Sequence, residues 1–124
     1  MQLRRSGEDY LETILVLQMK YGSVRSLDVA DTLNVTRPSV SNAIRRLQDG
    51  GYLVMNKDKT LVLTDIGHEV ASRVYERHCV LKNGLVSLGV DPEVAERDAC
   101  GIEHLISDET FEIIKRLWME RRAQ

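Results

Sequence analysis

The chain has 124 residues, 43% of them apolar and 29% charged, and its formal net charge is −2. These values suit a soluble globular protein of one or two small domains, and no apolar run approaches the ~20 residues of a membrane-spanning helix. The first eight residues lack the apolar segment of a signal peptide. We therefore expect a cytoplasmic protein in which Cys79 and Cys100 are reduced thiols rather than a disulfide.

Charge is divided unevenly along the chain. Residues 1–64 carry nine Lys or Arg and seven Asp or Glu, a balance of +2, whereas residues 65–124 carry eight and twelve, a balance of −4. The overall negative charge by itself argues against a nucleic-acid-binding protein. A basic half followed by an acidic half nevertheless fits a chain in which only the first half binds an anionic partner.

The first predicted element is a helix from Ser6 to about Tyr21, with Gly22 as its stop. Ser6 is placed to cap this helix, and Asp9 then occupies its third position. The apolar side chains that recur at helical spacing are Leu11, Ile14 and Leu15. Asp9 and Glu12 are three residues apart and project from the same side. They are either first-turn acids that oppose the helix dipole or candidate ligands for a cation.

Residues 26–49 predict a helix-turn-helix motif. Ser26 is placed to cap a short helix over residues 27–33, and Thr36 to cap a second helix with Pro38 in its first turn, where a missing N–H costs nothing. The first helix is expected to turn Leu27, Ala30 and Leu33 inward. The second is expected to bury Val40, Ala43, Ile44 and Leu47 and to expose Arg37, Ser39, Ser41, Asn42, Arg45 and Arg46. A polar and basic outer face is typical of a DNA-recognition helix, and the alternative is a helical hairpin whose charges are only solvated.

A β-hairpin is predicted directly after this motif. Gly50 and Gly51 end the second helix, residues 52–55 and 60–63 read as strands, and a polar turn joins them. Lys57 and Lys59 in this turn are able to meet phosphate groups. Helix-turn-helix followed by such a hairpin indicates a winged-helix DNA-binding domain.

The second half of the chain is predicted to be helical. Thr64 is placed to cap a long helix that runs to about Leu88, and further helices are expected over residues 92–106 and after Ser107. The inward side chains of the first are predicted to be Ala95, Ala99, Ile102 and Leu105. In the second, Phe111, Ile114, Leu117 and Trp118 form one face. These helices are too few to bury a core alone, so association with a second copy is expected. The fold class is therefore mainly α, with a winged helix-turn-helix domain at residues 1–72 and a helical dimerisation domain at residues 73–124.

Cys100, Glu103 and His104 are the most distinctive cluster in this half. On a helix they stand at i, i+3 and i+4 and project from one face. A thiol, a carboxylate and an imidazole together suit a divalent transition metal. The alternative is a chance grouping on a solvated face.

Several motifs, taken in order, resemble the iron- and manganese-dependent repressors of the diphtheria toxin repressor type. They are GEDYLE at residues 7–12, TRPSVS at 36–41, LTDIG at 63–67, Arg77-His78, and DACGIEHLISDE at 98–109. The resemblance covers nearly the full length and corresponds to the short, two-domain form without an SH3-like domain. It implies a homodimer that binds operator DNA when metal-loaded and represses metal-uptake genes.

The resemblance also assigns site residues. The positions that match metal ligands are Asp9, Glu12, His78, Cys100, Glu103 and His104. The positions that match DNA contacts are Thr36, Pro38, Ser39 and Asn42, with backbone contacts from Arg37, Arg45 and the wing residues Lys57 and Lys59. The implied cofactor is Mn²⁺ or Fe²⁺, for which Co²⁺, Ni²⁺ or Zn²⁺ can substitute.

The chain departs from the family pattern at particular positions. Cys100 matches the iron-sensing branch, whereas Asp9 matches the manganese-sensing branch, and the positions of an ancillary metal site hold Lys82 and Glu96. One alternative function is a metal-independent winged-helix regulator that responds to an organic ligand or to oxidation of Cys79 or Cys100. A metallohydrolase is the other, but the sequence offers no Gly-rich loop and no separate general base, so we expect no enzyme.

Overall fold

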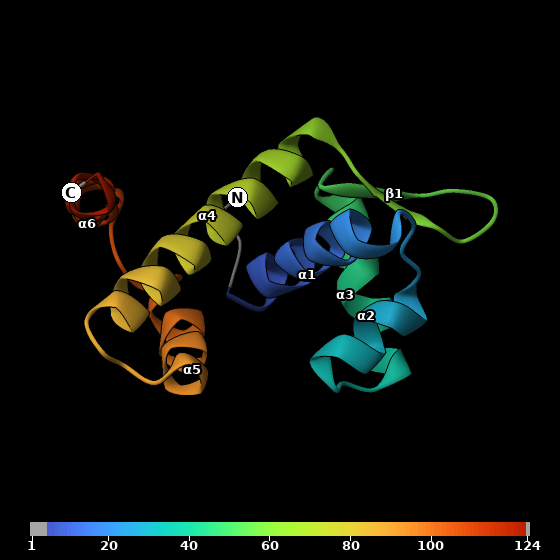
Figure 1. Cartoon of the computed structure of the whole chain (residues 1–124). Helices are drawn as coiled ribbons and strands as arrows, with labels where there is room; N and C mark the ends of the chain where they lie inside the picture. Colours follow the sequence, from blue (N-terminus) through green and yellow to red (C-terminus); the bar gives the residue numbers. More distant parts are fainter. Residues whose placement is uncertain (1–4, 124) are drawn as a thin grey trace. The chain divides into compact units, whose positions relative to one another are not determined.

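The computed structural model of the chain describes residues 5–123 and divides into two compact units, residues 1–72 and 73–124. The described part contains six helices and one two-stranded sheet, so the fold is mainly helical (Figure 1). Helix α4 (Asp65–Ser87) begins in the first unit and continues into the second. Within the described residues no helix is long and apolar enough to cross a membrane.

Three helices form the body of the first unit: α1 (Arg5–Tyr21), α2 (Ser26–Leu33) and α3 (Arg37–Asp49). Their shared core is apolar, and its most deeply buried helical side chains are Leu11, Ile14, Val29 and Val40. The predicted inner face of α3, residues 40, 43, 44 and 47, is buried, and its predicted outer residues are exposed. The helix-turn-helix prediction is therefore confirmed at residue level for α3.

The start of α3 also follows the prediction. The Thr36 hydroxyl accepts a hydrogen bond from the backbone N–H of Ser39 at 3.3 Å, and Pro38 lies in the first turn. Asn34, which ends α2, adopts a left-handed conformation with φ 55°. Asn tolerates this conformation better than most residues, which lets the chain turn sharply between the two helices.

Two predicted N-caps are wrong. Ser6 lies inside α1, and Ser26 is the first residue of α2 rather than its cap. The cap of α2 is Arg25, whose backbone N–H donates to the Asp28 carboxylate at 2.9 Å. Leu27 is also misassigned, because it is 48% exposed while Val29 is fully buried. The two positions are about 200° apart around the helix axis, so both cannot face the core.

The wing is a hairpin of β1 (Leu53–Met55) and β2 (Leu61–Leu63), paired antiparallel with Leu53 opposite Leu63. Each strand is one residue shorter than predicted. The N–H of Leu61 also donates to the carbonyl of Val24 at 2.7 Å, and Arg25 bridges to Thr60. The segment between α1 and α2 thus fixes the base of the wing against the helices.

The first turn of helix α4 lies very close to the backbone that leads into β1. Thr64 caps it as predicted, since its hydroxyl accepts the N–H of Gly67 at 3.2 Å and donates to the carbonyl of Gly51 at 2.6 Å. A Cβ atom at residue 67 would lie 1.8 Å from the carbonyl oxygen of Tyr52. Only glycine allows this approach, which ties the first turn of α4 to the chain entering β1.

The second unit contains the rest of α4, α5 (Pro92–Ile102) and α6 (Asp108–Arg122). Its buried apolar side chains are Val74, Val80 and Leu81 on α4, Ala95 and Ala99 on α5, and Phe111 on α6. The last helix begins after Ser107, as predicted, and the Ser107 side chain caps it by accepting the N–H of Thr110 at 3.1 Å.

Helix α5 ends earlier than predicted. It stops at Ile102, with Glu103 as its C-cap, and does not reach Ile106. Leu105 follows in the turn and is 78% exposed, so its predicted inward position is wrong. The Arg77 guanidinium donates to the carbonyls of Glu103 and Ile106, at 3.2 and 2.7 Å. A side chain from α4 thus satisfies two carbonyls of the turn that follows α5.

Candidate metal centre

A buried carboxylate lies at the centre of the polar cluster in the second unit. Glu103 is 1% exposed and sits where α5 ends. Its Oε2 lies 2.8 Å from Nδ1 of His78 on α4, and its Oε1 lies 3.2 Å from Nε2 of His104. The carboxylate therefore lies between two imidazoles that come from different parts of the unit.

Cys100 joins this cluster. The Cys100 thiol, a ring nitrogen of His78 and a carboxylate oxygen of Glu103 all lie within 4.8 Å of one another. Oε1 of Glu103 is buried and, although it lies 3.2 Å from Nε2 of His104, it forms no hydrogen bond among the described residues. Burying such an oxygen without a partner is costly, and a cation would satisfy it. Sulfur, nitrogen and oxygen donors at this spacing fit a divalent transition metal.

His104 reaches the cluster in a different way from the one predicted. Because α5 ends at Ile102, His104 lies in the following turn and does not stand at i+4 on a helix. Glu103 keeps its helical position, since its N–H still donates to the carbonyl of Ala99 at 3.0 Å. Cys100 and Glu103 therefore keep their i, i+3 relation, and the turn brings in the third side chain.

The cluster is strongly polarised. The hydrogen bond to Glu103 raises the pKa of His78 to about 9, with further help from the charges of Glu103 and Glu96 and against the opposing effect of burial. His78 is accordingly an imidazolium at neutral pH, with each ring N–H donating to a carboxylate. A metal that binds through this ring must displace a proton.

Arg77 holds the turn that carries the cluster. Its buried guanidinium donates to the two carbonyls after α5, forms an ion pair with Asp108 at the start of α6, and stacks 5.2 Å from the centroid of the Phe111 ring. Sequence reasoning included Arg77 only as part of a motif and missed this role. Its partners lie 26 to 31 residues away, so no local pattern indicates it.

Glu96 and Lys82 form a second layer beside His78. Oε1 of Glu96 lies 3.0 Å from Nε2 of His78, and its Oε2 lies 2.9 Å from Nζ of Lys82. Burial alone would raise the pKa of Glu96, but the hydrogen bonds from Lys82 and His78 outweigh it and lower that pKa. The i, i+4 spacing of His78 and Lys82, with an acid on the next helix, is the signal that could have indicated this arrangement.

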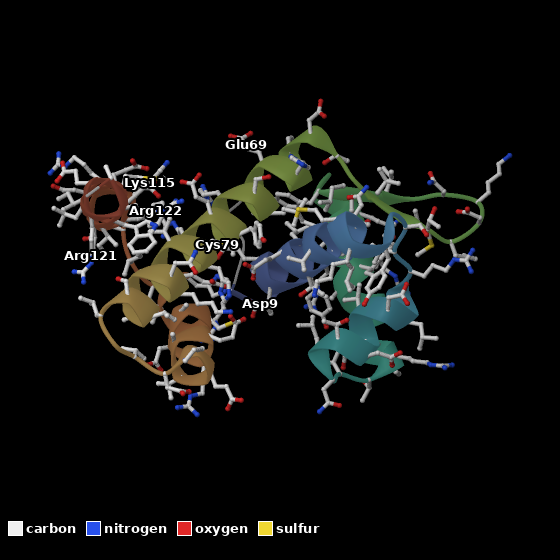
Figure 2. The ribbon with its side chains drawn as sticks, in the orientation of Figure 1. Asp9, Glu69, Cys79, Lys115, Arg121 and Arg122 are labelled. Atoms are coloured by element: carbon white, nitrogen blue, oxygen red, sulfur yellow. The ribbon has the colours of Figure 1, made fainter. Side chains whose placement is uncertain are left out.

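The remaining predicted ligands belong to the first unit. Asp9 and Glu12 lie on α1, three residues apart, and both are half-buried (Figure 2 labels Asp9). Their spacing places the two carboxylates on the same side of the helix, as predicted.

The predicted DNA-contact residues lie on the surface of the first unit. Thr36, Arg37, Pro38, Ser39, Asn42 and Arg45 are all exposed on or before α3. Lys57 and Lys59 are exposed in the wing turn, where hydrogen bonds from Thr60 lower the pKa of Asp58 and hold the turn in shape. This unit thus presents a basic helix face and two lysines on a constrained hairpin.

Comparison with known families gives two matches that together span most of the chain. The N-terminal DNA-binding domain of iron-dependent repressors matches residues 2–61. The metal-binding and dimerisation domain of the same repressors matches residues 64–121.

Individual relatives agree with these matches. The transcriptional regulator MntR of Salmonella typhimurium is 39% identical over 105 residues, covering 85% of this chain and 67% of the relative. The HTH-type transcriptional regulator MntR of Listeria monocytogenes serotype 4a is 39% identical over 102 residues, covering 82% and 72%.

Solved structures share the fold. The metal-dependent transcriptional regulator MtsR matches with a TM-score of 0.83 at 26% identity. A manganese-dependent transcriptional repressor in complex with manganese matches with a TM-score of 0.82 at 27% identity. Each match covers 90% of this chain and 52% of the other, so the chain spans about half the length of these two structures.

Proposed function

Because the chain belongs to the iron-dependent repressor family, we propose that it represses metal-uptake genes by binding operator DNA as a homodimer when loaded with Mn²⁺ or Fe²⁺. The observation that carries this proposal is the convergence of Cys100, His78 and Glu103 ligand atoms within 4.8 Å in the second unit. The first unit supplies an exposed recognition helix and wing for the DNA.

We infer that six residues hold the metal. Four come from the second unit and two from α1: His78, Cys100, Glu103 and His104, with Asp9 and Glu12. A bound divalent ion supplies positive charge that offsets the carboxylates. Ligands from α1 and from the second unit would couple metal binding to the DNA-binding unit, because α1 packs directly against α2 and α3. Metal binding then changes DNA affinity only to the extent that the metal binds the DNA-competent state more tightly than the other state.

The proposed ligands include both a soft sulfur donor and harder oxygen and nitrogen donors. Thiolate from Cys100 favours Fe²⁺, Co²⁺, Ni²⁺ or Zn²⁺, whereas the carboxylates and imidazoles also suit Mn²⁺. One of the similar solved structures is a manganese-dependent transcriptional repressor in complex with manganese, which supports Mn²⁺ as a physiological candidate. Both metals therefore belong in the test.

For DNA, we infer two classes of contact. Thr36, Pro38, Ser39 and Asn42 at the start of α3 reach base edges in the major groove. Arg37, Arg45, Lys57 and Lys59 contact phosphates and position the unit. A homodimer would present two α3 helices to half-sites ~34–36 Å apart, one turn of DNA, or a multiple of that distance.

The test is a fluorescence-anisotropy titration of a promoter fragment from a divalent-metal uptake gene of the same genome. Wild-type protein should bind at least about tenfold more tightly with Mn²⁺ or Fe²⁺ than with chelator, a coupling of about 1.4 kcal/mol or more. Glu103→Gln should abolish the response. Glu93→Gln, at an exposed position of the same helix, should retain it.

Equal affinity with and without chelator would contradict the proposal. If binding instead changed on mild oxidation and Cys79→Ser or Cys100→Ser removed that change, the oxidation-responsive regulator would replace it. Neither Cys79 nor Cys100 forms a disulfide in the part of the chain that the structure describes, so both outcomes are open to measurement.

A further inference from the structure

Glu96 contacts His78 but is not one of the six proposed metal ligands. It lies on α5 opposite two α4 side chains, His78 and Lys82, which are four residues apart and therefore on one face. Each of its carboxylate oxygens has its own partner: Oε1 lies 3.0 Å from Nε2 of His78, and Oε2 lies 2.9 Å from Nζ of Lys82.

The two ring nitrogens of His78 therefore face different carboxylates. Nδ1 lies 2.8 Å from Glu103, in the cluster that includes Cys100, whereas Nε2 faces Glu96. A histidine that binds a metal through one nitrogen usually donates its other ring N–H to a carboxylate, which fixes the tautomer and the ring orientation. His78 has this arrangement, with Nδ1 on the side of the candidate ligands.

We propose that Glu96 is a positioning residue that accepts the Nε2–H of His78 so that Nδ1 is the metal-binding atom, and that Lys82 anchors Glu96 in this role. This inference rests on the proposed metal-dependent function. The ammonium of Lys82 occupies the second oxygen of Glu96 and keeps that carboxylate from turning towards the ion.

Glu96 and Lys82 together also limit His78 to binding one ion. Nε2 keeps its proton and cannot coordinate, both oxygens of Glu96 are engaged, and Lys82 places a positive charge where a second cation would approach. Replacing Lys82 by Glu would reverse that charge. Residue 82, Glu96 and Nε2 of His78 would then offer two carboxylates and an imidazole to a second ion.

A matched ion pair in the same unit provides the control. Nζ of Lys115 on α6 lies 2.9 Å from Glu76 on α4, the same distance as in the Lys82–Glu96 pair (Figure 2 labels Lys115). Glu76 and Glu96 are both 47% exposed. Neither member of this control pair belongs to the proposed ligand set, so loss of a surface ion pair is separated from loss of the contact with His78.

The experiment measures Co²⁺ affinity and stoichiometry of the full chain by equilibrium dialysis, with the thiolate–Co²⁺ absorption band as a reporter of Cys100. Glu96→Gln should weaken Co²⁺ binding about 10- to 100-fold while retaining the band, whereas Glu76→Gln should leave affinity within about twofold of wild type. Wild type should bind one Co²⁺ at His78, and Lys82→Glu should bind one more ion per chain than wild type.

A second readout tests the tautomer directly. In the Zn²⁺-loaded protein, ¹⁵N NMR should show His78 with metal on Nδ1 and a proton on Nε2, and His68→Gln and His104→Gln variants assign the signals. Zn²⁺ on Nε2, or equal affinity losses in the Glu96 and Glu76 variants, would overturn the inference while leaving the metal-dependent repressor intact. Failure of wild type to bind Co²⁺ or Zn²⁺ would overturn both.

Discussion

In the first unit the deeply buried side chains are apolar, among them Leu11, Ile14 and Leu53, whereas the second unit also buries the charged residues Arg77 and Glu103. Apolar burial is nearly insensitive to pH and to metal ions, but a buried charge is stable only with its partners in place. The core of the first unit therefore depends little on pH or metal ions, whereas the second unit depends on buried charges that must keep their partners. Trp118, the only tryptophan of the chain, lies on α6 and reports on the second unit alone.

The largest effect should come from the core of the first unit. Leu53→Ala should lower the free energy of unfolding by about 2–5 kcal/mol, because it removes buried methyl groups and leaves a cavity. Circular dichroism in urea should give the same loss at pH 6.5 and 9.5, with and without metal. Val54→Ala, at the exposed neighbour, is the control and should cost far less. A loss that varied with pH or metal would show that the core of the first unit is not independent of them.

The next effect should come from the buried cation of the second unit. Arg77→Met keeps the aliphatic stem but removes charge-assisted hydrogen bonds, at about 1.5–3 kcal/mol for such bonds. Urea unfolding followed by Trp118 fluorescence should detect the loss, and metal affinity should fall as well because the Glu103 turn is released. Arg116→Met, at an exposed arginine of α6, should change neither. Unchanged metal affinity in Arg77→Met would show that the turn carrying Glu103 keeps its conformation without the Arg77 contacts.

The stability of the second unit, unlike that of the first, should also depend on pH. The pKa of His78 is raised from 6.5 to about 9, so its contribution to stability is complete below pH 6.5 and is lost as pH rises towards 9. In chelator, unfolding followed by Trp118 should lose about 1–2 kcal/mol across this window, after allowance for solvent screening. His78→Gln should flatten the curve, and His68→Gln should not. A rise in stability with pH would have the wrong sign for this mechanism.

The smallest effect should be confined to DNA binding. Lys57→Gln in the wing turn should weaken binding by about 1 kcal/mol and reduce the slope of log affinity against log salt by about 0.9. Neither unfolding nor metal affinity should change, because the side chain is exposed. Lys115→Gln, in the second unit, serves as the control with unchanged salt slope. An unchanged slope for Lys57→Gln would place the wing away from the phosphates.

Local physical rules were enough to predict the first unit in most of its detail. The Thr36 cap, the buried stripe of α3 and the two strands each depend on residues close in sequence. Even the errors there are local: Asp28 reaches back to the N–H of Arg25, so α2 begins one residue before its predicted start. Capping alternatives of this kind have similar energies, which is why boundaries are hard to predict.

The second unit shows where such rules fail. The sequence pattern alone extends α5 to Ile106, but in the structure α5 ends at Ile102 and Arg77, from another helix, donates to the carbonyls of Glu103 and Ile106. The contact between Glu96 and His78 likewise depends on how α4 and α5 pack. Cys100, Glu103 and His78 could be named as candidates from motifs, whereas their support by Arg77, Glu96 and Lys82 required the tertiary structure.

The position of the cluster at the end of α5 also has a consequence for an incoming ion. Cys100 is exposed and Glu103 is buried, with His78 beside both, and ligand atoms of the three residues lie within 4.8 Å of one another. An ion arriving from solvent therefore meets the thiol first and the carboxylate last. Because binding through His78 displaces a proton, we expect metal affinity to rise with pH.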